Sequence, residues 1–239
     1  MFRLLDLFSG IGGFSLGLER SGGFKTVAFC EIDPFCRKVL NKHWPKVPCY
    51  ENITTLTVDT LRADGIGVDA ICGGFPCQDI STAGKGAGIK EGTRSGLWFE
   101  YARLIGELRP RYVIVENVAA LLGRGLDRVL GDLAALGYDA EWHCIPAAAV
   151  GARHIRDRVW IIAFLPDAKS QRFVQRWWQQ FQADGEAQRH IRERFDQPEP
   201  VRVADGIPHR VDRNTSLGNA VIPQIPEIIG KAILEAEKE

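Results

Sequence analysis

The sequence predicts an α/β fold: a doubly wound, mostly parallel sheet with a small irregular insert. Over the first 165 residues, short apolar runs of strand length alternate with segments that have the 3.6-residue period of helices. From about Pro166 to Asp205 this alternation ends, and the chain becomes polar and rich in glutamine and arginine. We therefore expect a main domain over residues 1–165, a short insert over 166–201, and a segment over 202–239 that returns to the main domain.

Each predicted element follows from a local pattern. The apolar runs predict buried strands over Arg3–Phe8, Thr26–Cys30, Asp69–Gly73, Arg111–Glu116 and Val159–Phe164. Helical periods predict helices over Gly12–Arg20, Pro34–Asn41, Ser95–Leu108, Leu126–Leu136 and Ile222–Ala236. The second helix begins with Pro34, which suits a first helical turn, after Asp33 as the N-cap. Strands that alternate with helices in this way form parallel sheets.

The composition excludes several classes of protein. The 239 residues are 45% hydrophobic and 25% charged, as in an ordinary globular protein. No apolar run approaches the ~18 residues of a membrane span and no signal-peptide pattern opens the chain, so we expect a cytoplasmic protein. The six cysteines form no C-x-x-C pair, so neither a disulfide framework nor a metal site is expected. The formal net charge is zero, which is unusual for a nucleic-acid binder, but arginines are concentrated toward the C-terminal end.

The segment DLFSGIGGFSLGLE, residues 6–19, predicts a ligand-binding turn. Its glycines lie between a strand and a helix, where they permit a tight turn and let a ligand approach the backbone. Glu31 follows the next strand, roughly 20 residues on, where a carboxylate can accept hydrogen bonds from ribose hydroxyls. The pattern favours an adenosine-containing ligand but does not separate NAD, FAD and S-adenosylmethionine. A turn needed only for packing is the alternative.

The segment ICGGFPCQDIS, residues 71–81, places Cys77 just beyond the carboxyl end of the third strand. Ligands bind at this end of open α/β sheets, so the position favours a nucleophile. An inert buried cysteine is the usual alternative, and we expect it for the other five.

Two further segments place polar groups near the same edge. VIVENV ends the fourth strand with Glu116 and Asn117, which could exchange a proton or cap a helix. GARHIRDRVWIIA places Arg156 and Arg158 on the same side of an extended chain, suited to a phosphate or a base edge, or to surface salt bridges. LGNAVIPQ, residues 217–224, puts a Gly-Asn turn before the last helix.

Together and in this order, the segments resemble the motifs of the bacterial and phage DNA (cytosine-5) methyltransferase family. The matching stretches are DLFSGIGG, EID, GFPCQDIS, ENV, RHIRDR and GNAVIP, over roughly residues 1–165 and 202–239. The combination of FSGIGG, GFPCQ and ENV is far more specific than any one of them. The resemblance implies an S-adenosylmethionine-dependent methyltransferase fold, S-adenosyl-L-methionine as methyl donor and double-stranded DNA as substrate. It also implies a monomer in a restriction-modification system, with a cognate restriction endonuclease as a further partner.

The resemblance implies roles for individual residues. Cys77 would be the attacking thiolate, Glu116 the acid that contacts cytosine N3, and Asn117 the residue that holds the active-site loop; Arg156 and Arg158 would orient the flipped base and the thiolate. The implied cofactor contacts are Phe8, Gly10, Ile11, Gly12, Gly13, Glu31, Ile32, Asn52, Ile53, Pro76, Leu97, Asn219 and Val221. The expected DNA contacts are Gln78, Ser81, Arg176 and Arg202. No metal is expected.

The chemistry agrees with these roles. Cytosine C5 is a poor nucleophile, and addition of a thiolate at C6 with protonation at N3 makes an enamine whose C5 can attack an activated methyl group. Loss of the C5 proton then expels Cys77. The base must leave the duplex, which implies a flipping pocket, and we expect a cationic lining to stabilise the thiolate near neutral pH.

The chain departs from the family pattern in three places. Asn52 occupies a position that is often acidic, and we expect its amide to accept one hydrogen bond from the adenine amino group; His154 replaces a common glutamine. Only about 40 residues lie between Ala163 and Arg202, where many relatives carry a much longer target-recognition domain. Since each base contact contributes only ~1–3 kcal/mol of discrimination, we expect a short or degenerate target site, dependence on a partner, or loss of robust activity.

Three rival interpretations remain open at this stage. The substrate could be RNA, since one branch of the family modifies tRNA. The chain could be a weakly active or degenerate DNA-binding remnant. An NAD-dependent oxidoreductase fits the glycine turn but leaves PCQ and ENV unexplained.

Overall fold

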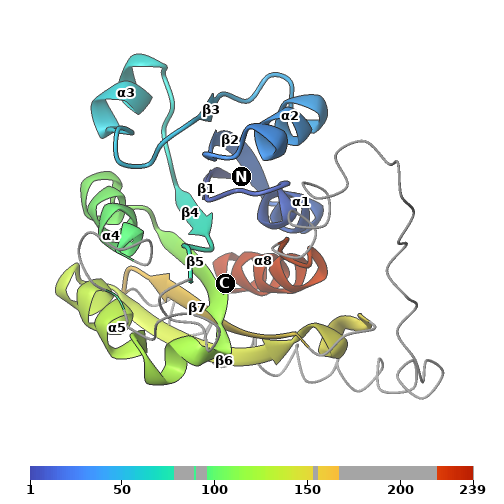
Figure 1. Cartoon of the computed structure of the whole chain (residues 1–239), viewed down its shortest axis with the longest axis vertical. Helices are drawn as coiled ribbons and strands as arrows, with labels where there is room; N and C mark the ends of the chain where they lie inside the picture. The colour runs from blue at the N-terminus through green and yellow to red at the C-terminus, as the bar shows by residue number, and fades with distance from the viewer. Residues whose placement is uncertain (78–88, 90–95, 153–155, 167–219, 239) are drawn as a thin grey trace.

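The computed structural model describes residues 1–77, 89, 96–152, 156–166 and 220–238 (Figure 1). The predicted insert and the expected contacts Gln78, Ser81, Arg176, Arg202 and Asn219 lie outside these residues. None of the helices within the described ranges is both long and apolar enough to cross a membrane.

Seven strands form one mixed sheet in the order β3-β2-β1-β4-β5-β7-β6. They are β1 (Phe2–Leu7), β2 (Phe24–Cys30), β3 (Cys49–Tyr50), β4 (Ala70–Gly73), β5 (Tyr112–Val118), β6 (Asp139–Pro146) and β7 (Asp157–Phe164). The first five pair in parallel, whereas β7 runs antiparallel to both β5 and β6. The predicted doubly wound, mostly parallel sheet is therefore confirmed.

Helices cover both faces of the sheet. They are α1 (Gly13–Arg20), α2 (Pro34–His43), α3 (Val58–Ala63), α4 (Leu97–Leu108), α5 (Leu126–Ala135) and α8 (Gln224–Glu237), with 3-10 turns η1 (Ala119–Gly123) and η2 (Ala147–Val150). Figure 1 shows α1 and α8 side by side on one face, and α4 and α5 on the other. The core is accordingly divided into two clusters, one on each side of the sheet.

Alternating side chains of the central strands supply both clusters. In β5, Val113 and Val115 pack toward α4 and α5, whereas Tyr112 and Ile114 pack toward α8. A strand that is buried on both faces has no polar face, which explains why the apolar runs predicted these strands. The C-terminal helix closes the second cluster through its isoleucines, among them Ile229 and Ile233, both fully buried.

The sequence analysis missed β3, α3 and β6. The strand β6 lies at the sheet edge and most of its side chains are exposed or half-buried, so its sequence DAEWHCIP lacks an apolar run.

The antiparallel direction of β7 was not predicted separately. It matters for the site, because the start of β7 lies at the same edge as the carboxyl end of β5: Arg158 is paired with Val118.

Candidate active site

A cavity of about 470 Å³ opens at the carboxyl ends of β4 and β5. It is lined by Ile32, Gly74, Phe75, Pro76, Cys77, Leu97, Glu116, Asn117, Val118, Arg156 and Arg158. All five residues predicted to carry the chemistry thus line one cavity, together with Ile32, Pro76 and Leu97 from the predicted cofactor contacts. Ligands bind at this edge in open α/β sheets, because the loops there diverge.

An ion pair crosses the cavity wall from β5 to β7. Arg158 Nε lies 2.9 Å from Glu116 Oε1, and Glu116 is only 9% exposed. Burial raises the pKa of Glu116 above its ordinary value. The positive charges of Arg158 and Arg156 lower this pKa, but the effect of burial is larger. Near neutral pH, Glu116 therefore holds a proton more often than an exposed glutamate would, which suits an acid that protonates a base.

The thiol of Cys77 is half-buried, and its surroundings favour the neutral form. Burial raises the pKa of Cys77, the negative charge of Glu116 raises it further, and Arg158 opposes both. The net direction is upward, so the expectation that a cationic lining makes Cys77 a thiolate near neutral pH is wrong for this arrangement. The physical reason is that burial, together with the negative charge of Glu116, outweighs the effect of Arg158.

Asn117 ties the loop that carries Cys77 to the end of β5. Its Nδ2 donates to the Phe75 carbonyl oxygen at 3.1 Å, its Oδ1 accepts from the Val118 N–H at 2.9 Å, and the residue is 2% exposed. Because both the nitrogen and the oxygen of this buried amide are hydrogen-bonded, the Asn117 side chain is held in one orientation. This contact holds the backbone two residues before the thiol, as expected for Asn117.

Gly74 allows Glu116 to lie against the loop. A Cβ at Gly74 would come within 2.9 Å of Glu116 Oε2, closer than real Cβ contacts. The structure shows that this glycine makes room for the carboxylate of the protein itself.

The glycine turn after β1 has a strained backbone. Phe8, Gly10 and Gly12 all have positive φ, of 53°, 53° and 87°; for a bulky residue such as Phe8 this is costly, and such strain gathers at ligand sites. The Gly10 N–H donates to Glu31 Oε2 at 2.7 Å, and the Asp33 N–H to Oε1 at 2.8 Å. Since a carboxylate has about four lone-pair sites, Glu31 is fixed in place and can still accept bonds from a ligand.

Side chains near Glu31 differ in what they can offer a ligand. Ile32 is 70% exposed, an unusual state for an isoleucine at the end of a buried strand. The Oδ1 of Asn52 accepts from both the N–H and the hydroxyl of Thr54, each at 3.0 Å, which uses both of its lone pairs. The expectation that this amide accepts from an adenine amino group is therefore not met. Ile53 is 4% exposed and packs in the core, so its side chain is not available to a ligand.

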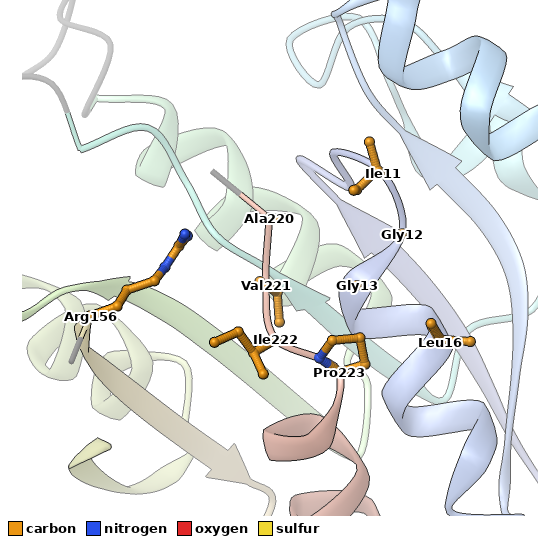
Figure 2. Close-up of a pocket in the computed structure, with 9 residues that line it drawn as sticks. All are labelled: Ile11, Gly12, Gly13, Leu16, Arg156, Ala220, Val221, Ile222 and Pro223. Atoms are coloured by element: carbon orange, nitrogen blue, oxygen red, sulfur yellow. The ribbon is translucent and has the colours of Figure 1, made fainter. Parts of the chain in front are cut away.

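A second cavity, of about 290 Å³, lies between the glycine turn and the segment that enters α8 (Figure 2). It is lined by Ile11, Gly12, Gly13, Leu16, Arg156, Ala220, Val221, Ile222 and Pro223. The two segments touch closely, because a Cβ at Gly13 would lie 2.4 Å from the Val221 carbonyl oxygen. The structure thus brings Val221 to the glycine turn, more than 200 residues away in sequence.

Arg156 lines both cavities from the start of β7. Its φ is 38°, so the extended conformation predicted for Arg156 and Arg158 is wrong at this residue. Both arginines nevertheless reach the larger cavity. The side chain of Arg156 extends toward Ala220 (Figure 2).

Asp6 is a functional candidate that the sequence analysis did not consider. It is fully buried beneath the glycine turn, and its Oδ2 accepts from the hydroxyl of Ser15 at 2.7 Å and from its N–H at 3.3 Å. Burial raises the pKa of Asp6 to about 7, against the lowering effect of the bonds from Ser15. An aspartate within the buried run of residues 4–7 was the available signal.

The described residues contain no group of three or more His, Cys, Asp or Glu side chains that could hold a metal ion. Of the six cysteines, Cys30, Cys36 and Cys72 are buried, whereas Cys144 is exposed.

Comparison with known proteins agrees with this geometry. The family model described as C-5 cytosine-specific DNA methylase matches residues 2–228. The type II methyltransferase M2.BsuMI of Bacillus subtilis strain 168 is 36% identical over 171 residues, 68% of this chain and 42% of its own length. The type II methyltransferase M.Eco47II of Escherichia coli is 36% identical over 173 residues, which are 70% of this chain and 40% of that protein. The chain therefore spans about two fifths of the length of these curated relatives.

A solved structure has the same fold. The crystal structure of a DNA modification methyltransferase encoded within an E. coli prophage matches with a TM-score of 0.59 and 25% identity. The match covers 72% of this chain and 50% of that one.

Proposed function

The chain belongs to the C-5 cytosine-specific DNA methylase family, and we propose that it transfers a methyl group from S-adenosyl-L-methionine to C5 of cytosine in double-stranded DNA. The observation that carries this proposal is the cavity in which Cys77, Glu116 and Arg158 meet beside Ile32 and Leu97. A nucleophile, an acid and apolar surface for a ligand are thereby close together, as methyl transfer through a covalent adduct requires.

The residues at the glycine turn fit the cofactor. Glu31 is held by the Gly10 and Asp33 N–H groups and keeps lone pairs for ribose hydroxyls. Beside it, the exposed Ile32 offers an apolar surface for a planar base. Phe8, Gly10, Ile11, Gly12 and Gly13 form the turn, and we assign them to the cofactor together with Glu31, Ile32, Pro76, Leu97, Asn219 and Val221. The bound cofactor would supply the activated methyl group.

The chain's own residues would prepare the base. The Sγ of Cys77 bonds to cytosine C6, while Glu116 places a proton on N3 and so draws electrons toward the ring nitrogen. The resulting enamine is nucleophilic at C5. After methyl transfer, a base removes the proton from C5, the electron pair re-forms the C5–C6 double bond, and the Cys77–C6 bond breaks. The raised pKa of Glu116 supports its role as the proton donor.

Asn117 and Arg158 would position the reacting groups. The bond from Asn117 to the Phe75 carbonyl oxygen holds the Cys77 loop, and the ion pair with Arg158 fixes the Glu116 carboxyl group. Arg158, with Arg156, also provides donors for a flipped base. Arg158 would also support ionisation of the thiol, because its charge lowers the pKa of Cys77 against the effects of burial and of Glu116.

Target recognition is the least supported part of the function. We propose Gln78, Ser81, Arg176 and Arg202 as DNA contacts. The short segment between β7 and α8 supports a short or degenerate target site, or a partner that completes recognition. We further propose that the protein acts as a cytoplasmic monomer beside a cognate restriction endonuclease; the type II names of its relatives support the endonuclease.

Trapping on 5-fluorocytosine DNA tests the proposed function. Fluorine at C5 blocks the elimination step, so the active protein should remain covalently bound to the duplex in the presence of S-adenosylmethionine, and Cys77→Ser should form no adduct. Tritiated cofactor with duplex DNA or tRNA gives the second readout. Label incorporated only into RNA would exclude DNA as the substrate, and a trapped complex formed equally by Cys77→Ser would exclude the proposed nucleophile.

A further inference from the structure

The indole N–H of Trp160 is a buried donor that has no hydrogen-bond partner among the described residues. Trp160 lies in β7 and is only 1% exposed, so bulk solvent does not reach it. Two other tryptophans do have partners: Trp44 Nε1 donates to Glu19 at 3.0 Å, and Trp98 Nε1 donates to Asp132 at 2.8 Å. A buried indole N–H usually finds such a partner, because an unsatisfied donor is costly. The position of Trp160 therefore calls for a ligand that accepts a hydrogen bond.

A cavity of about 10 Å³ is lined in part by this indole ring. Four of its nine lining residues are polar, namely Glu116, Arg156, Arg158 and Trp160, and the other five are apolar. A space of this volume holds a single water molecule, and a buried water needs two to four polar partners. The cavity meets both requirements.

The sheet brings Trp160 and Glu116 to the same side. The two residues lie directly opposite each other in the antiparallel ladder of β5 and β7. Side chains at such positions share one face of the sheet, with Cβ atoms ~4.5–5.5 Å apart. Glu116 is 9% exposed, and its Oε1 lies 2.9 Å from Arg158 Nε. Since a carboxyl group can accept several hydrogen bonds, this ion pair leaves capacity for one more.

We propose that this cavity binds one water molecule, which accepts a hydrogen bond from Trp160 Nε1 and donates one to the carboxyl group of Glu116. The inference rests on the proposed function, because it gives Trp160 a task there: with the water, Trp160 holds the acid in the orientation that faces the base. Trp160 is not among the described residues that line the larger cavity, so it is a positioning residue that acts through Glu116. Arg158 and the water together would leave the carboxyl group little freedom to turn.

A chloride ion is the other small ligand that an indole N–H and guanidinium groups could bind. We favour water because Glu116 lines the same cavity. Chloride cannot donate a hydrogen bond to the carboxyl group, and the carboxylate form would repel it. Water both accepts and donates, so one molecule satisfies Trp160 and Glu116 together.

Nuclear magnetic resonance of the full chain, without DNA or cofactor, tests the water site. The indole N–H resonance of Trp160 is assigned by its loss in Trp160→Phe. It should show an Overhauser cross-peak to water with the sign of a long-lived bound molecule. Trp98 is the internal control, because its N–H donates directly to Asp132 and should show no such cross-peak. A Trp160 resonance without the cross-peak would overturn the proposal, and so would a chemical shift that follows the chloride concentration.

Exchange of a single group tests the positioning role. The unnatural residue 3-benzothienylalanine at position 160 keeps the fused ring and its contact with Phe14 but has sulfur in place of the N–H. Single-turnover methyl transfer to duplex DNA should fall about 5- to 10-fold, as for one lost hydrogen bond. The affinities for S-adenosylhomocysteine and for the duplex should stay within about twofold of wild type. The same residue at position 142, where Trp142 is 44% exposed, should change neither rate nor affinity.

The pH profile separates positioning from packing. A hydrogen bond from the water favours the charged form of Glu116, so loss of this bond should raise the pKa of Glu116. Transfer needs the protonated acid, so its decline on the alkaline side should begin at a higher pH in the position-160 variant. The other ionisable groups around Glu116 are Cys77, Arg156 and Arg158, and the variant leaves all three in place.

The remaining outcomes are also decisive. An unchanged rate, or a slower rate with an unchanged pH profile, would overturn the positioning role and leave the proposed function standing. Wild-type protein that transfers no methyl group would refute the proposed function and the positioning role with it. The water itself is judged by the cross-peak, which requires no activity.

Discussion

The guanidinium of Arg158 lies 2.9 Å from the carboxylate of Glu116, and the two groups act in opposite directions on the pKa of Cys77, which lines the same cavity. Glu116 raises the pKa of Cys77, and Arg158 lowers it. Cys77, Glu116 and Arg158 are therefore one electrostatic unit, and a change at any of the three should be measurable at the other two.

Replacing Glu116 with glutamine should make Cys77 more reactive while it stops methyl transfer. Removal of the negative charge lowers the pKa of Cys77, so alkylation by iodoacetamide at pH 8 should become faster than in wild type. Transfer should fall by about 10²–10⁴-fold, because the proton donor at N3 is lost. Thiol alkylation followed by mass spectrometry, beside a tritium transfer assay, measures both. Slower alkylation of the variant would show that Glu116 does not control the thiol.

Replacing Arg158 with glutamine should have the opposite effect on the thiol. Loss of this cation raises the pKa of both Cys77 and Glu116, so alkylation at pH 8 should slow. The variant also leaves a buried carboxyl group without its ion-pair partner, which typically costs about 3–5 kcal/mol while the group is charged. Because Glu116 becomes protonated as the pH falls, the loss of stability should be smaller at pH 5 than at pH 8. Urea unfolding at both values provides the test, and an equal loss at both would contradict it.

Gly74→Ala should impair the site, whereas Gly131→Ala should not. A Cβ at Gly74 would lie 2.9 Å from Glu116 Oε2, so the carboxyl group or the loop before Cys77 must move. A displacement of this size at the reacting groups should reduce transfer about 10²-fold. At Gly131, inside α5, a Cβ meets nothing within 4 Å, and alanine should stabilise the helix by about 0.5–1 kcal/mol with normal transfer. Normal transfer by Gly74→Ala would show that the close approach is unimportant.

Asp6→Asn should change how stability depends on pH. The pKa of Asp6 is raised to about 7 in the folded protein, above its unfolded value. A group with a raised folded pKa favours the folded state most at low pH, and this contribution is lost as the pH rises through about 7. Wild-type protein should therefore lose stability relative to Asp6→Asn between about pH 4 and pH 8, by up to about 4 kcal/mol. Thermal unfolding across this range measures the difference, and parallel curves for the two proteins would contradict the raised pKa.

Strands could be predicted where burial on both faces of the sheet requires a run of apolar residues. The runs around Val113 and Ile161 are apolar because both sheet faces are covered, and this alone located β5 and β7. The edge strand β6 could not be found in this way, because residues such as Trp142 are 44% exposed and its pattern is that of a surface segment. Strand direction was equally inaccessible, since a single strand has the same composition whether its neighbour runs parallel or antiparallel.

The same distinction applies to the candidate site: features that depend on local sequence could be predicted, whereas features that depend on contacts in the folded chain could not. Cys77 was predicted from its position beyond a strand end, which depends on local sequence and on the general geometry of α/β sheets. The role of Glu116 was implied only by the resemblance to the methyltransferase motifs. The thiol pKa was predicted in the wrong direction, because burial of Cys77 and the charge of Glu116 outweigh Arg158, and neither effect can be read from the spacing of residues in the sequence. Likewise, the Asn52 side chain was expected to accept a hydrogen bond from a ligand, but its Oδ1 already accepts two hydrogen bonds from Thr54.

The pairing of Arg158 with Val118 across two oppositely directed strands has a consequence for how the protein tolerates insertion and deletion. Side chains along a strand point alternately to the two sides, so a slip of β7 by one position would present Asp157 or Val159 to Glu116 in place of the guanidinium. Asp157 would place a second carboxylate beside Glu116. Val159 would leave the Glu116 carboxylate beside a hydrocarbon side chain. One residue gained or lost within this ladder should therefore abolish the proposed methyl transfer, although the sequence around Cys77 is unchanged.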